Sequence, residues 1–324
     1  MKALVLIGGF GTRLRPITYT VPKQLIPLAG KAMLYHVLDL LPPDVEEVVL
    51  ATGYKAELVD RFVREHPRPY PVRTVAEEEP LGTGGGMRNA ADGMSDPFYL
   101  LNSDVIAKVD LADVRDQHLR HGGVGTMTLA EVDDVRPYGV AALEADDRIS
   151  GFIEKPEPPD APSRWINAGL AVWNRSVLDR IPPGRPVSFE REIVPGLLAD
   201  RVYGYRLSSY WDDAGTPERL LRSQRLLFED GRGGAGGLPR GAQGTGPVAA
   251  LDGAMAWGAS FGPFVTLGAD SVVESGAHVE NSILMEGVRV ETGARVSGSL
   301  LAPGTVVRAG HRVADRVSAA GAEL

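Results

Sequence analysis

The fold is decided by residues 3–13, which read ALVLIGGFGTR. The apolar run from Ala3 to Ile7 is typical of a parallel strand that is buried on both faces, and Gly8 ends it. Further strands are predicted at 47–52 and 98–101, with helices at about 32–41 and 55–65. This alternation predicts an α/β domain with a mixed, mainly parallel sheet. Ligands of such sheets bind beyond the carboxyl ends of the strands, so the residues after Ile7 and Leu101 are the first candidates for a site.

The rest of the chain divides into the end of this domain, a linker and a second domain. Shorter strands are predicted at 126–132, 140–143 and 168–173, and a helix from Pro217 to about Phe228 closes the first domain. Residues 231–247 are rich in glycine, which is typical of a flexible linker. We therefore expect a first domain at residues 1–230, a linker at 231–247 and a second domain at 248–324.

The second domain repeats itself every 17 residues. The repeats begin with a glycine and contain a short apolar strand, as in Gly276-Ala277-His278-Val279, Gly293-Ala294-Arg295-Val296 and Gly310-His311-Arg312-Val313. Short strands with a glycine at each corner predict a parallel β-helix whose coils share one core. The pattern resembles the left-handed hexapeptide type, with about three coils. A small antiparallel sandwich would explain the alternation but not the constant offset.

Composition excludes several classes of function. The chain has 324 residues and no cysteine, which excludes disulfides, thiolate metal sites and cysteine nucleophiles. Lys and Arg number 34 against 42 Asp and Glu, and the net charge of −8 disfavours a nucleic-acid partner. The sequence contains no apolar stretch of the length that a membrane span or a signal peptide needs. We therefore expect a cytoplasmic protein without nucleic-acid or membrane partners.

The loop after the first strand is suited to polyphosphate. Residues 8–16 match neither the dinucleotide motif GxGxxG nor the phosphate loop GxxxxGK[ST]. Their glycine amides can nevertheless approach phosphate oxygens closely, and Arg13 places a cation at the end of the loop. Lys23, in the segment PKQLIP at 22–27, adds a second cation. Taken alone, these residues would also fit an ordinary turn and a solvated lysine.

Taken together, the motifs resemble the signature of the sugar-1-phosphate nucleotidyltransferases. Members similar to mannose-1-phosphate guanylyltransferases, with a C-terminal left-handed β-helix, match best. The resemblance implies a Rossmann-like nucleotidyltransferase domain followed by that β-helix. Ala32 departs from the proline usual in the family, and the long glycine-rich linker is also unusual. The matching segments, in the family's order, are GGFGTRLRP at 8–16, PKQLIP at 22–27, EPLGTGG at 79–85, LNSDV at 101–105, YGV at 138–140, FIEKP at 152–156, NAG at 167–169 and WDDAGTP at 211–217.

The resemblance implies attack by a sugar 1-phosphate oxygen on the α-phosphorus of a nucleoside triphosphate, with release of pyrophosphate. The attacking phosphate has a second pKa of about 6 and needs no general base near neutrality. The family implies Mg²⁺ as cofactor, held by Asp104 and Asp213, and oxygen ligands suit this metal. Each aspartate alone would also fit a structural role, Asp104 in a turn and Asp213 before a helix. The family's spacing favours Asp213 over the adjacent Asp212.

Further roles follow from the resemblance. Arg13 is expected at the β- and γ-phosphates, and Lys23 at the α-phosphate, so that Arg13, Lys23, Asp104 and Asp213 form the catalytic set. The nucleotide is expected to contact Leu6, Gly8, Gly9, Gly11, Thr12, Arg13, Glu79, Pro80, Gly82 and Thr83. The sugar phosphate is expected to contact Gly139, Glu154, Lys155 and Asn167.

The substrates are less sharply defined by the sequence. Residues 22–27 look more like the thymidylyltransferases, but the segment at 79–85, expected beside the base, resembles the guanylyltransferase form. We therefore expect GTP, with mannose 1-phosphate or a related hexose or cyclitol phosphate such as valienol 1-phosphate. A glucose-1-phosphate thymidylyltransferase is the alternative, and a non-catalytic regulatory or assembly subunit is disfavoured because all four catalytic residues are present. We expect the β-helix to mediate homo-oligomer formation.

Overall fold

The computed structural model describes residues 1–233 and 237–324. The chain forms two compact units, and each is built from two segments. The first unit contains residues 1–9 and 37–211, and the second contains 10–36 and 212–324. The chain therefore leaves the first unit directly after Gly9 and again after Trp211. None of the described helices has the length and apolarity that a membrane span requires.

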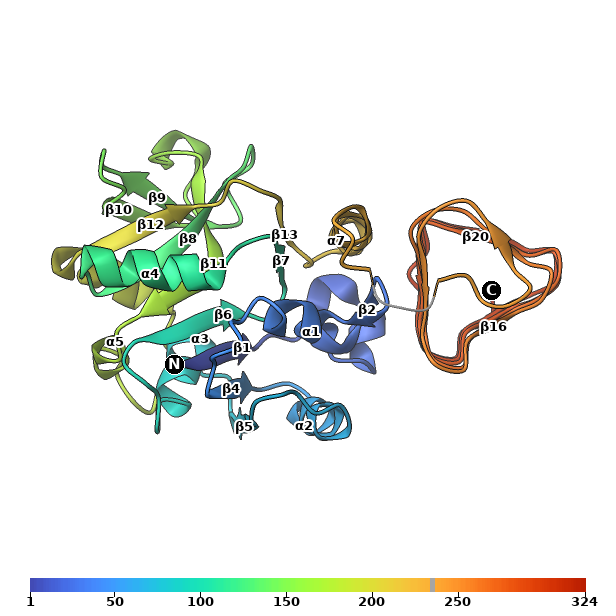
Figure 1. The fold of residues 1–324 in the computed structure, drawn as a ribbon, viewed down its shortest axis with the longest axis horizontal. Helices are drawn as coiled ribbons and strands as arrows, with labels where there is room; N and C mark the ends of the chain where they lie inside the picture. The colour runs from blue at the N-terminus through green and yellow to red at the C-terminus, as the bar shows by residue number, and fades with distance from the viewer. Residues whose placement is uncertain (234–236) are drawn as a thin grey trace. The chain divides into compact units, whose positions relative to one another are not determined.

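A mixed sheet forms the centre of the first unit (Figure 1). In the described residues its order is β10-β9-β11-β6-β1-β4-β5, and β8 and β12 continue from β11. The strands are β1 (Lys2–Ile7), β4 (Glu47–Thr52), β5 (Val72–Ala76), β6 (Phe98–Asn102), β8 (Gly125–Glu131), β9 (Gly139–Leu143), β10 (Ile149–Glu154), β11 (Trp165–Trp173) and β12 (Val202–Arg206). β1 runs parallel to β4 and β6, and its residues Leu4 and Val5 are fully buried. The predicted α/β fold with a mixed, mainly parallel sheet is confirmed.

The register of the sheet brings several strand ends to one edge. Leu6 of β1 lies opposite Asn102 of β6, and Ile7 lies opposite Thr52 of β4. The glycine loop after β1 and the polar turn after β6 therefore start at the same edge, where ligands of parallel sheets bind. The turn leads into β7 (Val105–Ala107).

Several helices connect the strands, and the first of them, α1, begins at the end of the short segment that belongs to the second unit. They are α1 (Met33–Leu38), α2 (Ala56–Glu65), α3 (Gly82–Asn89), α4 (Leu111–His121), α5 (Ser176–Asp179) and α6 (Val194–Leu197). α2 buries Val59 and Val63, which lie one turn apart on the same face. Asp110 caps α4: its carboxylate accepts the backbone N–H groups of Ala112 and Asp113 at 2.8 and 3.3 Å, and this cap fixes the start of the helix.

Helix α3 contains three consecutive glycines, Gly84 to Gly86, and is not among the helices predicted from the sequence. Its glycines are required because the neighbouring residues leave no space for larger side chains. A Cβ at Gly84 would lie 2.9 Å from Cγ1 of Val187, and one at Gly86 would lie 2.5 Å from Oε1 of Glu77. Close packing therefore explains glycines that would otherwise weaken a helix.

The first segment of the second unit consists of short turns and a hairpin. One-turn helices span Thr12–Leu14, Ile17–Tyr19 and Lys23–Leu25, and β2 (Pro27–Leu28) pairs with β3 (Lys31–Ala32). The second segment begins with β13 (Trp211–Asp213) and α7 (Pro217–Glu229). Thr216 caps α7 by accepting the N–H of Arg219 at 3.3 Å, and Pro217 takes the first helical position.

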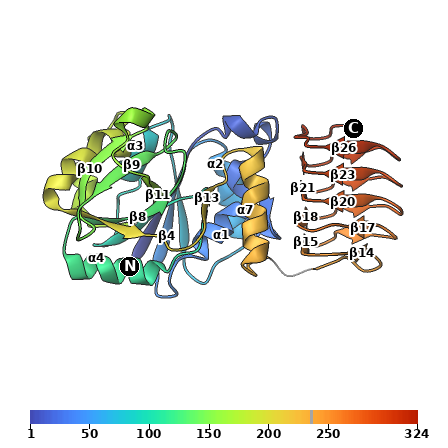
Figure 2. The ribbon, with the colours of Figure 1, turned by 90° about the horizontal axis from the view of Figure 1, so that it is seen from above.

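The C-terminal part of the second unit is a β-helix of three parallel sheets in the described residues (Figure 1). Figure 2 shows its coils stacked on one another. The sheets have the orders β14-β17-β20-β23-β26, β15-β18-β21-β24 and β16-β19-β22-β25, so the described β-helix has more coils than the three that the sequence suggested. Val248 pairs with Val265 and Val265 with Ser282, so neighbouring coils are offset by the 17 residues that the sequence predicted.

The strands of the β-helix are short, and the first begins inside the glycine-rich segment. They are β14 (Gln243–Gly244), β15 (Val248–Ala250), β16 (Met255–Ala256), β17 (Ser260–Phe261), β18 (Val265–Leu267), β19 (Val272–Val273), β20 (His278–Glu280), β21 (Ser282–Leu284), β22 (Arg289–Val290), β23 (Arg295–Ser297), β24 (Leu300–Leu301), β25 (Val306–Val307) and β26 (Arg312–Ala314).

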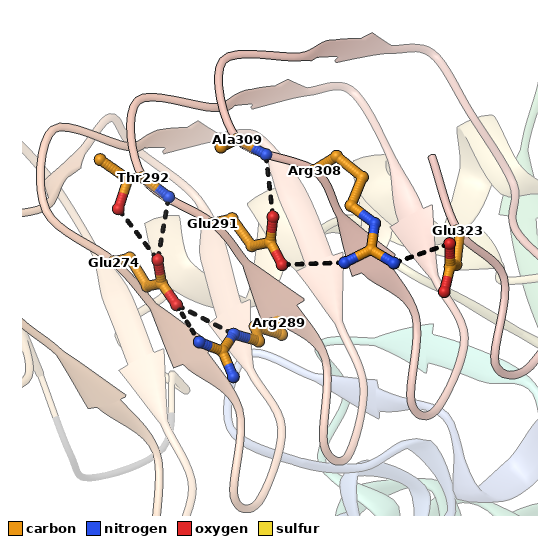
Figure 3. A network of polar contacts seen from close by, with 7 residues as sticks. All are labelled: Glu274, Arg289, Glu291, Thr292, Arg308, Ala309 and Glu323. Atoms are coloured by element: carbon orange, nitrogen blue, oxygen red, sulfur yellow. Dashed lines mark hydrogen bonds and ion pairs between the residues drawn. The ribbon is translucent and has the colours of Figure 1, made fainter.

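Polar side chains join neighbouring coils at one corner of the β-helix (Figure 3). Glu274 accepts a hydrogen bond from Nε of Arg289 at 2.9 Å. Arg308 contacts Glu291 at 3.1 Å and Glu323 at 2.8 Å. Both Glu274 and Glu291 also accept a backbone N–H from the following coil. These exposed pairs fix the coil register locally, although each contributes little free energy by itself.

Candidate active site

The turn after β6 lies against the middle of β11. Gly169 of β11 has a φ of +77°, and a Cβ at this position would lie 2.7 Å from Nδ2 of Asn102. Asn167 stabilises the bend, because its Oδ1 accepts the Gly169 N–H at 3.0 Å. The predicted sugar residue Asn167 is therefore held next to the turn that carries Asp104.

Glu154 and Gly139 face each other across two antiparallel strands. They pair in the register of β10 and β9, and a Cβ at Gly139 would lie 2.8 Å from Oε2 of Glu154. The Glu154 side chain is 13% exposed, and its Oε1 lies 3.5 Å from Nζ of the more exposed Lys155. Three of the four predicted sugar-phosphate residues are thus brought together at this end of the sheet.

The pKa of Glu154 is raised above that of an ordinary glutamate. Burial of the carboxyl is the main cause, and the negative charge of Glu190 acts in the same direction. The cation of Lys155 acts in the opposite direction. Two negative groups are therefore held near each other beside the predicted sugar site.

Glu190 was missed by sequence reasoning. It lies in a helical turn at Phe189–Ile193, and it accepts a hydrogen bond from Oγ1 of Thr83 at 2.6 Å. Thr83 in turn accepts the N–H of Phe189 at 2.9 Å. The resemblance places Thr83 at the nucleotide. Thr83 therefore connects α3 to Glu190, whose charge raises the pKa of Glu154. Residues 83 and 190 are far apart in sequence, and no local sequence pattern predicts this contact.

Glu77 is a second residue that sequence reasoning missed. Its Oε2 accepts the N–H of Leu81 at 3.0 Å, and burial raises the pKa of this carboxyl. The same oxygen would lie 3.8 Å from a Cβ at Gly53, the residue after β4. Glu77 therefore lies at the carboxyl ends of two parallel strands, β4 and β5, where ligands bind.

The predicted base-contacting residues at 79–83 lie in the turn that enters α3 and in the first two residues of that helix. Glu79, Pro80 and Gly82 are exposed in the described structure. Gly82 has a φ of +71°, and a Cβ there would lie 2.7 Å from the carbonyl oxygen of Val187, so the turn requires glycine. The exposure of Glu79 contrasts with the partial burial of Glu77 two residues earlier.

The predicted phosphate loop leaves β1 and enters the second unit. Gly8 and Gly9 are exposed, directly after Leu6 and Ile7 of β1. In the second unit Gly11 has a φ of +58°, and a Cβ there would lie 2.7 Å from Cγ2 of Thr18 and 3.6 Å from Cβ of Lys23. The second unit therefore places Lys23 beside the loop that continues with Thr12 and Arg13.

Arg13 lies against the segment that carries the second predicted metal ligand. A Cβ at Gly215 would lie 2.5 Å from Nη2 of Arg13 and 3.3 Å from Oδ2 of Asp213. The backbone N–H of Gly215 also donates to the carbonyl of Asp213 at 2.7 Å. Glycine at 215 thus lets the guanidinium of Arg13 approach the carboxylate of Asp213.

Two arginines of α7 extend this charged cluster. Arg219 forms an ion pair with Asp213 and lies 3.6 Å from the carboxylate of Asp212, which Arg222 also approaches at 3.6 Å. The Asp212 side chain is 1% exposed, and burial raises its pKa to about 6 although both arginines oppose the shift. Asp213, with its side chain 16% exposed, is the more accessible of the two carboxylates.

The residues present suit a hard divalent cation. In the part of the chain that the structure describes, no group of three or more acidic or histidine side chains is arranged around a metal position. A cation such as Mg²⁺ needs only one or two protein carboxylates, because water and substrate phosphates complete its coordination. Asp104 and Asp213 provide donors of that type.

Comparison with known proteins now identifies the family. Residues 2–229 match the family described as nucleotidyl transferase, and residues 264–321 match the GlmU-like C-terminal hexapeptide family. The chain belongs to the nucleotidyl transferase family. This nucleotidyltransferase is therefore an enzyme, and members of its family generally use a divalent metal ion.

The relatives of this nucleotidyltransferase are similar over both of its parts. It is 38% identical over 307 residues to a mannose-1-phosphate guanylyltransferase of Mycobacterium tuberculosis, covering 90% of this chain and 81% of the relative. It is 36% identical over 301 residues to mannose-1-phosphate guanylyltransferase 1 of Arabidopsis thaliana, covering 90% and 82%. Among solved structures, HddC of Yersinia pseudotuberculosis complexed with GMP-PN matches with a TM-score of 0.60 and 26% identity, covering 70% of this chain and 99% of that one.

Proposed function

We propose that the protein transfers a guanylyl group from GTP to mannose 1-phosphate or a closely related sugar 1-phosphate, with Mg²⁺, and releases pyrophosphate. The observation that carries this proposal is the similarity of 36–38% to mannose-1-phosphate guanylyltransferases over 90% of the chain. The similarity extends over most of those relatives as well, so the proposal covers the activity of the whole protein.

The four predicted catalytic residues suit the triphosphate. Arg13, held against Gly215, would neutralise the β- and γ-phosphates that leave as pyrophosphate. Lys23 beside Gly11 would stabilise the α-phosphate in the transition state. Asp104 and Asp213 would hold Mg²⁺, which when bound neutralises charge on the reacting phosphates. The protein thus supplies position and positive charge, and it needs no general base.

The residues of the first unit suit the sugar phosphate. The mostly buried Glu154 carboxylate would accept hydrogen bonds from sugar hydroxyls, while Lys155 would pair with the phosphate. Asn167 and Gly139 would shape the pocket around the ring. These contacts are compatible with several hexoses and with a cyclitol phosphate such as valienol 1-phosphate.

Guanine recognition is proposed for Glu77. Guanine presents two neighbouring donors, N1–H and the N2 amine, and a carboxylate presents two acceptors. One oxygen of Glu77 is engaged by the Leu81 N–H, which fixes the carboxylate in place. Because a buried acceptor left without a donor is costly, such a site would discriminate against bases that lack these donors.

A panel assay tests the proposal. Pyrophosphate release is measured for GTP, dTTP, ATP and UTP, each against mannose 1-phosphate, glucose 1-phosphate and valienol 1-phosphate. We expect the highest kcat/KM for GTP with mannose 1-phosphate. A kcat/KM for dTTP with glucose 1-phosphate that equals or exceeds it would favour the thymidylyltransferase alternative, and no turnover with any pair would favour a regulatory subunit.

A further inference from the structure

Helix α7 carries polar side chains toward two different parts of the second unit. Near its start, Arg219 pairs with Asp213 and Asp212. Five residues later, Gln224 is fully buried. At about 100° per residue, Arg219 and Gln224 point in directions that differ by roughly 140°. One side of the helix therefore contacts Asp213, and the side that carries Gln224 is buried against a different part of the second unit.

The amide of Gln224 joins α7 to the β-helix. Its Nε2 donates to the carbonyl oxygens of Phe264 at 2.8 Å and Ser282 at 3.4 Å, which belong to neighbouring coils. Its Oε1 accepts from Oγ1 of Thr266 at 2.5 Å. These three bonds tie one side chain of α7 to two coils of the β-helix.

The same amide reaches the turn that follows Lys23. Its Oε1 is also 3.5 Å from the backbone N–H of Ala29, between β2 and β3. Both donor hydrogens and both acceptor sites of the Gln224 amide are thus used. A buried amide with every hydrogen-bonding position occupied permits little sliding or rotation of the helix that carries it.

Aromatic contacts continue the junction toward the end of α7. The ring of Phe228 lies 6.2 Å from that of Phe264, and the guanidinium of Arg225 lies 5.2 Å from the centre of the Phe264 ring. α7 is therefore held to the β-helix over its second half, while its first turn holds Asp213 through Arg219.

We propose that Gln224 is a positioning residue for nucleotidyl transfer, through which the β-helix fixes the placement of Asp213 and of the Lys23 segment. The inference rests on the proposed function for the roles of Asp213 and Lys23. The β-helix then contributes to catalysis by holding α7 in place. A change at the β-helix, such as association with a second copy, can alter kcat through α7.

The test compares two buried substitutions in the full-length chain. Gln224→Met keeps the length of the side chain and removes all four hydrogen bonds. Thr305→Val is the matched control, because Thr305 is fully buried in the β-helix and its hydroxyl bonds Ala302 at 2.7 Å and Ser318 at 2.8 Å, both within the β-helix. We expect both variants to have a lower Tm. Only Gln224→Met should lose kcat, by tenfold or more, with the KM for GTP changed less than about threefold.

Amide hydrogen exchange supplies a readout that does not depend on substrate. We expect faster exchange at residues 212–219 in Gln224→Met and unchanged exchange there in Thr305→Val. Equal losses of kcat in both variants, or a kcat within twofold of the parent in Gln224→Met, would overturn the proposal. If the panel assay rejects guanylyl transfer while the exchange difference persists, the proposed function fails and the coupling through α7 stands.

If Gln224→Met does not fold, a milder variant tests the positioning role of Gln224. Thr266→Val removes only the hydroxyl that donates to Oε1 of Gln224. We expect its kcat to fall at least threefold, with faster exchange at 212–219. An unchanged kcat and unchanged exchange in a folded Thr266→Val would refute the positioning role.

Discussion

Gly215 and Arg13 lie so close together that a Cβ at position 215 would stand 2.5 Å from Nη2 of Arg13. The arginine comes from the loop after the first strand, and the glycine comes from the turn before α7, about two hundred residues later. The same Cβ would lie 3.3 Å from Oδ2 of Asp213. Absence of a side chain at 215 is therefore what lets a cation and a carboxylate of the proposed site approach each other.

The first prediction concerns this contact. Gly215→Ala should displace the Arg13 guanidinium and lower kcat/KM for the nucleoside triphosphate by about tenfold or more, with little change in the KM for the sugar phosphate. Steady-state kinetics with each substrate varied in turn measures the effect. Gly196→Ala is the matched control, since a Cβ there meets nothing within 4 Å. Equal kinetics in the two variants would contradict a role for the Arg13 contact.

The second prediction concerns the metal ligands. Asp104→Asn and Asp213→Asn should each lower kcat by at least about a hundredfold, because each removes negative charge from the Mg²⁺ site. Neither aspartate belongs to the apolar core, so circular dichroism should show an unchanged fold. Near-normal turnover in both variants would show that the metal is held elsewhere.

The parts of the fold with a strong local period could be predicted from the sequence. The apolar run before Gly8 identified β1 because that signal is local. The 17-residue offset identified the β-helix with its register because the same pattern recurs at a constant spacing along the chain. The domain limits at 230 and 248 stay predictions. Helix α3 could not be found this way, since its glycines are explained only by packing against Glu77 and Val187.

The motifs of the candidate site could be predicted from the sequence, but the contacts that connect their side chains could not. The resemblance identified Thr83 and Glu154 as candidate site residues but did not identify Glu190. Glu190 accepts a hydrogen bond from Thr83 and raises the pKa of Glu154, and residues 83 and 190 meet only in the folded chain. Arg219 was equally hidden. Arg219 lies in the first turn of α7, where the helix dipole makes a positive charge unfavourable. Its ion pairs with the buried Asp212 and with Asp213 explain why an arginine is found there.

The third prediction concerns pH. Burial and the charge of Glu190 raise the pKa of Glu154, so its carboxylate loses its charge at a higher pH than an ordinary glutamate. The ionised form accepts the sugar hydroxyls, so binding is complete above the raised pKa and weakens as the pH falls through it. The KM for the sugar phosphate should then rise by up to about tenfold per pH unit. The phosphate of the substrate also titrates near pH 6, but equally in all variants.

Two variants separate the protein's contribution from that of the substrate. Glu190→Gln should shift the acid limb of the KM profile to lower pH, because it removes the charge that raises the pKa of Glu154. Glu192→Gln, in the same helical turn, is the control, since its carboxylate accepts the backbone N–H of Ser188, whereas the Thr83 hydroxyl donates to Glu190. A limb at the same pH in the parent and in Glu190→Gln would refute the coupling between Glu190 and Glu154.

The last prediction concerns the base and separates two neighbouring glutamates. Glu77 is held by the Leu81 N–H at the strand ends, whereas Glu79 is exposed. Glu77→Gln replaces one acceptor oxygen by a donor that would face the donors of guanine, so kcat/KM for GTP should fall by about tenfold to a hundredfold. Thymine carries a single ring donor between two carbonyls, which an amide can satisfy, so kcat/KM for dTTP should change much less or rise. Glu79→Gln should leave the ratio of the two values unchanged. If Glu79→Gln alters that ratio and Glu77→Gln does not, the exposed residue contacts the base; if neither does, selectivity arises from the backbone of the turn that enters α3.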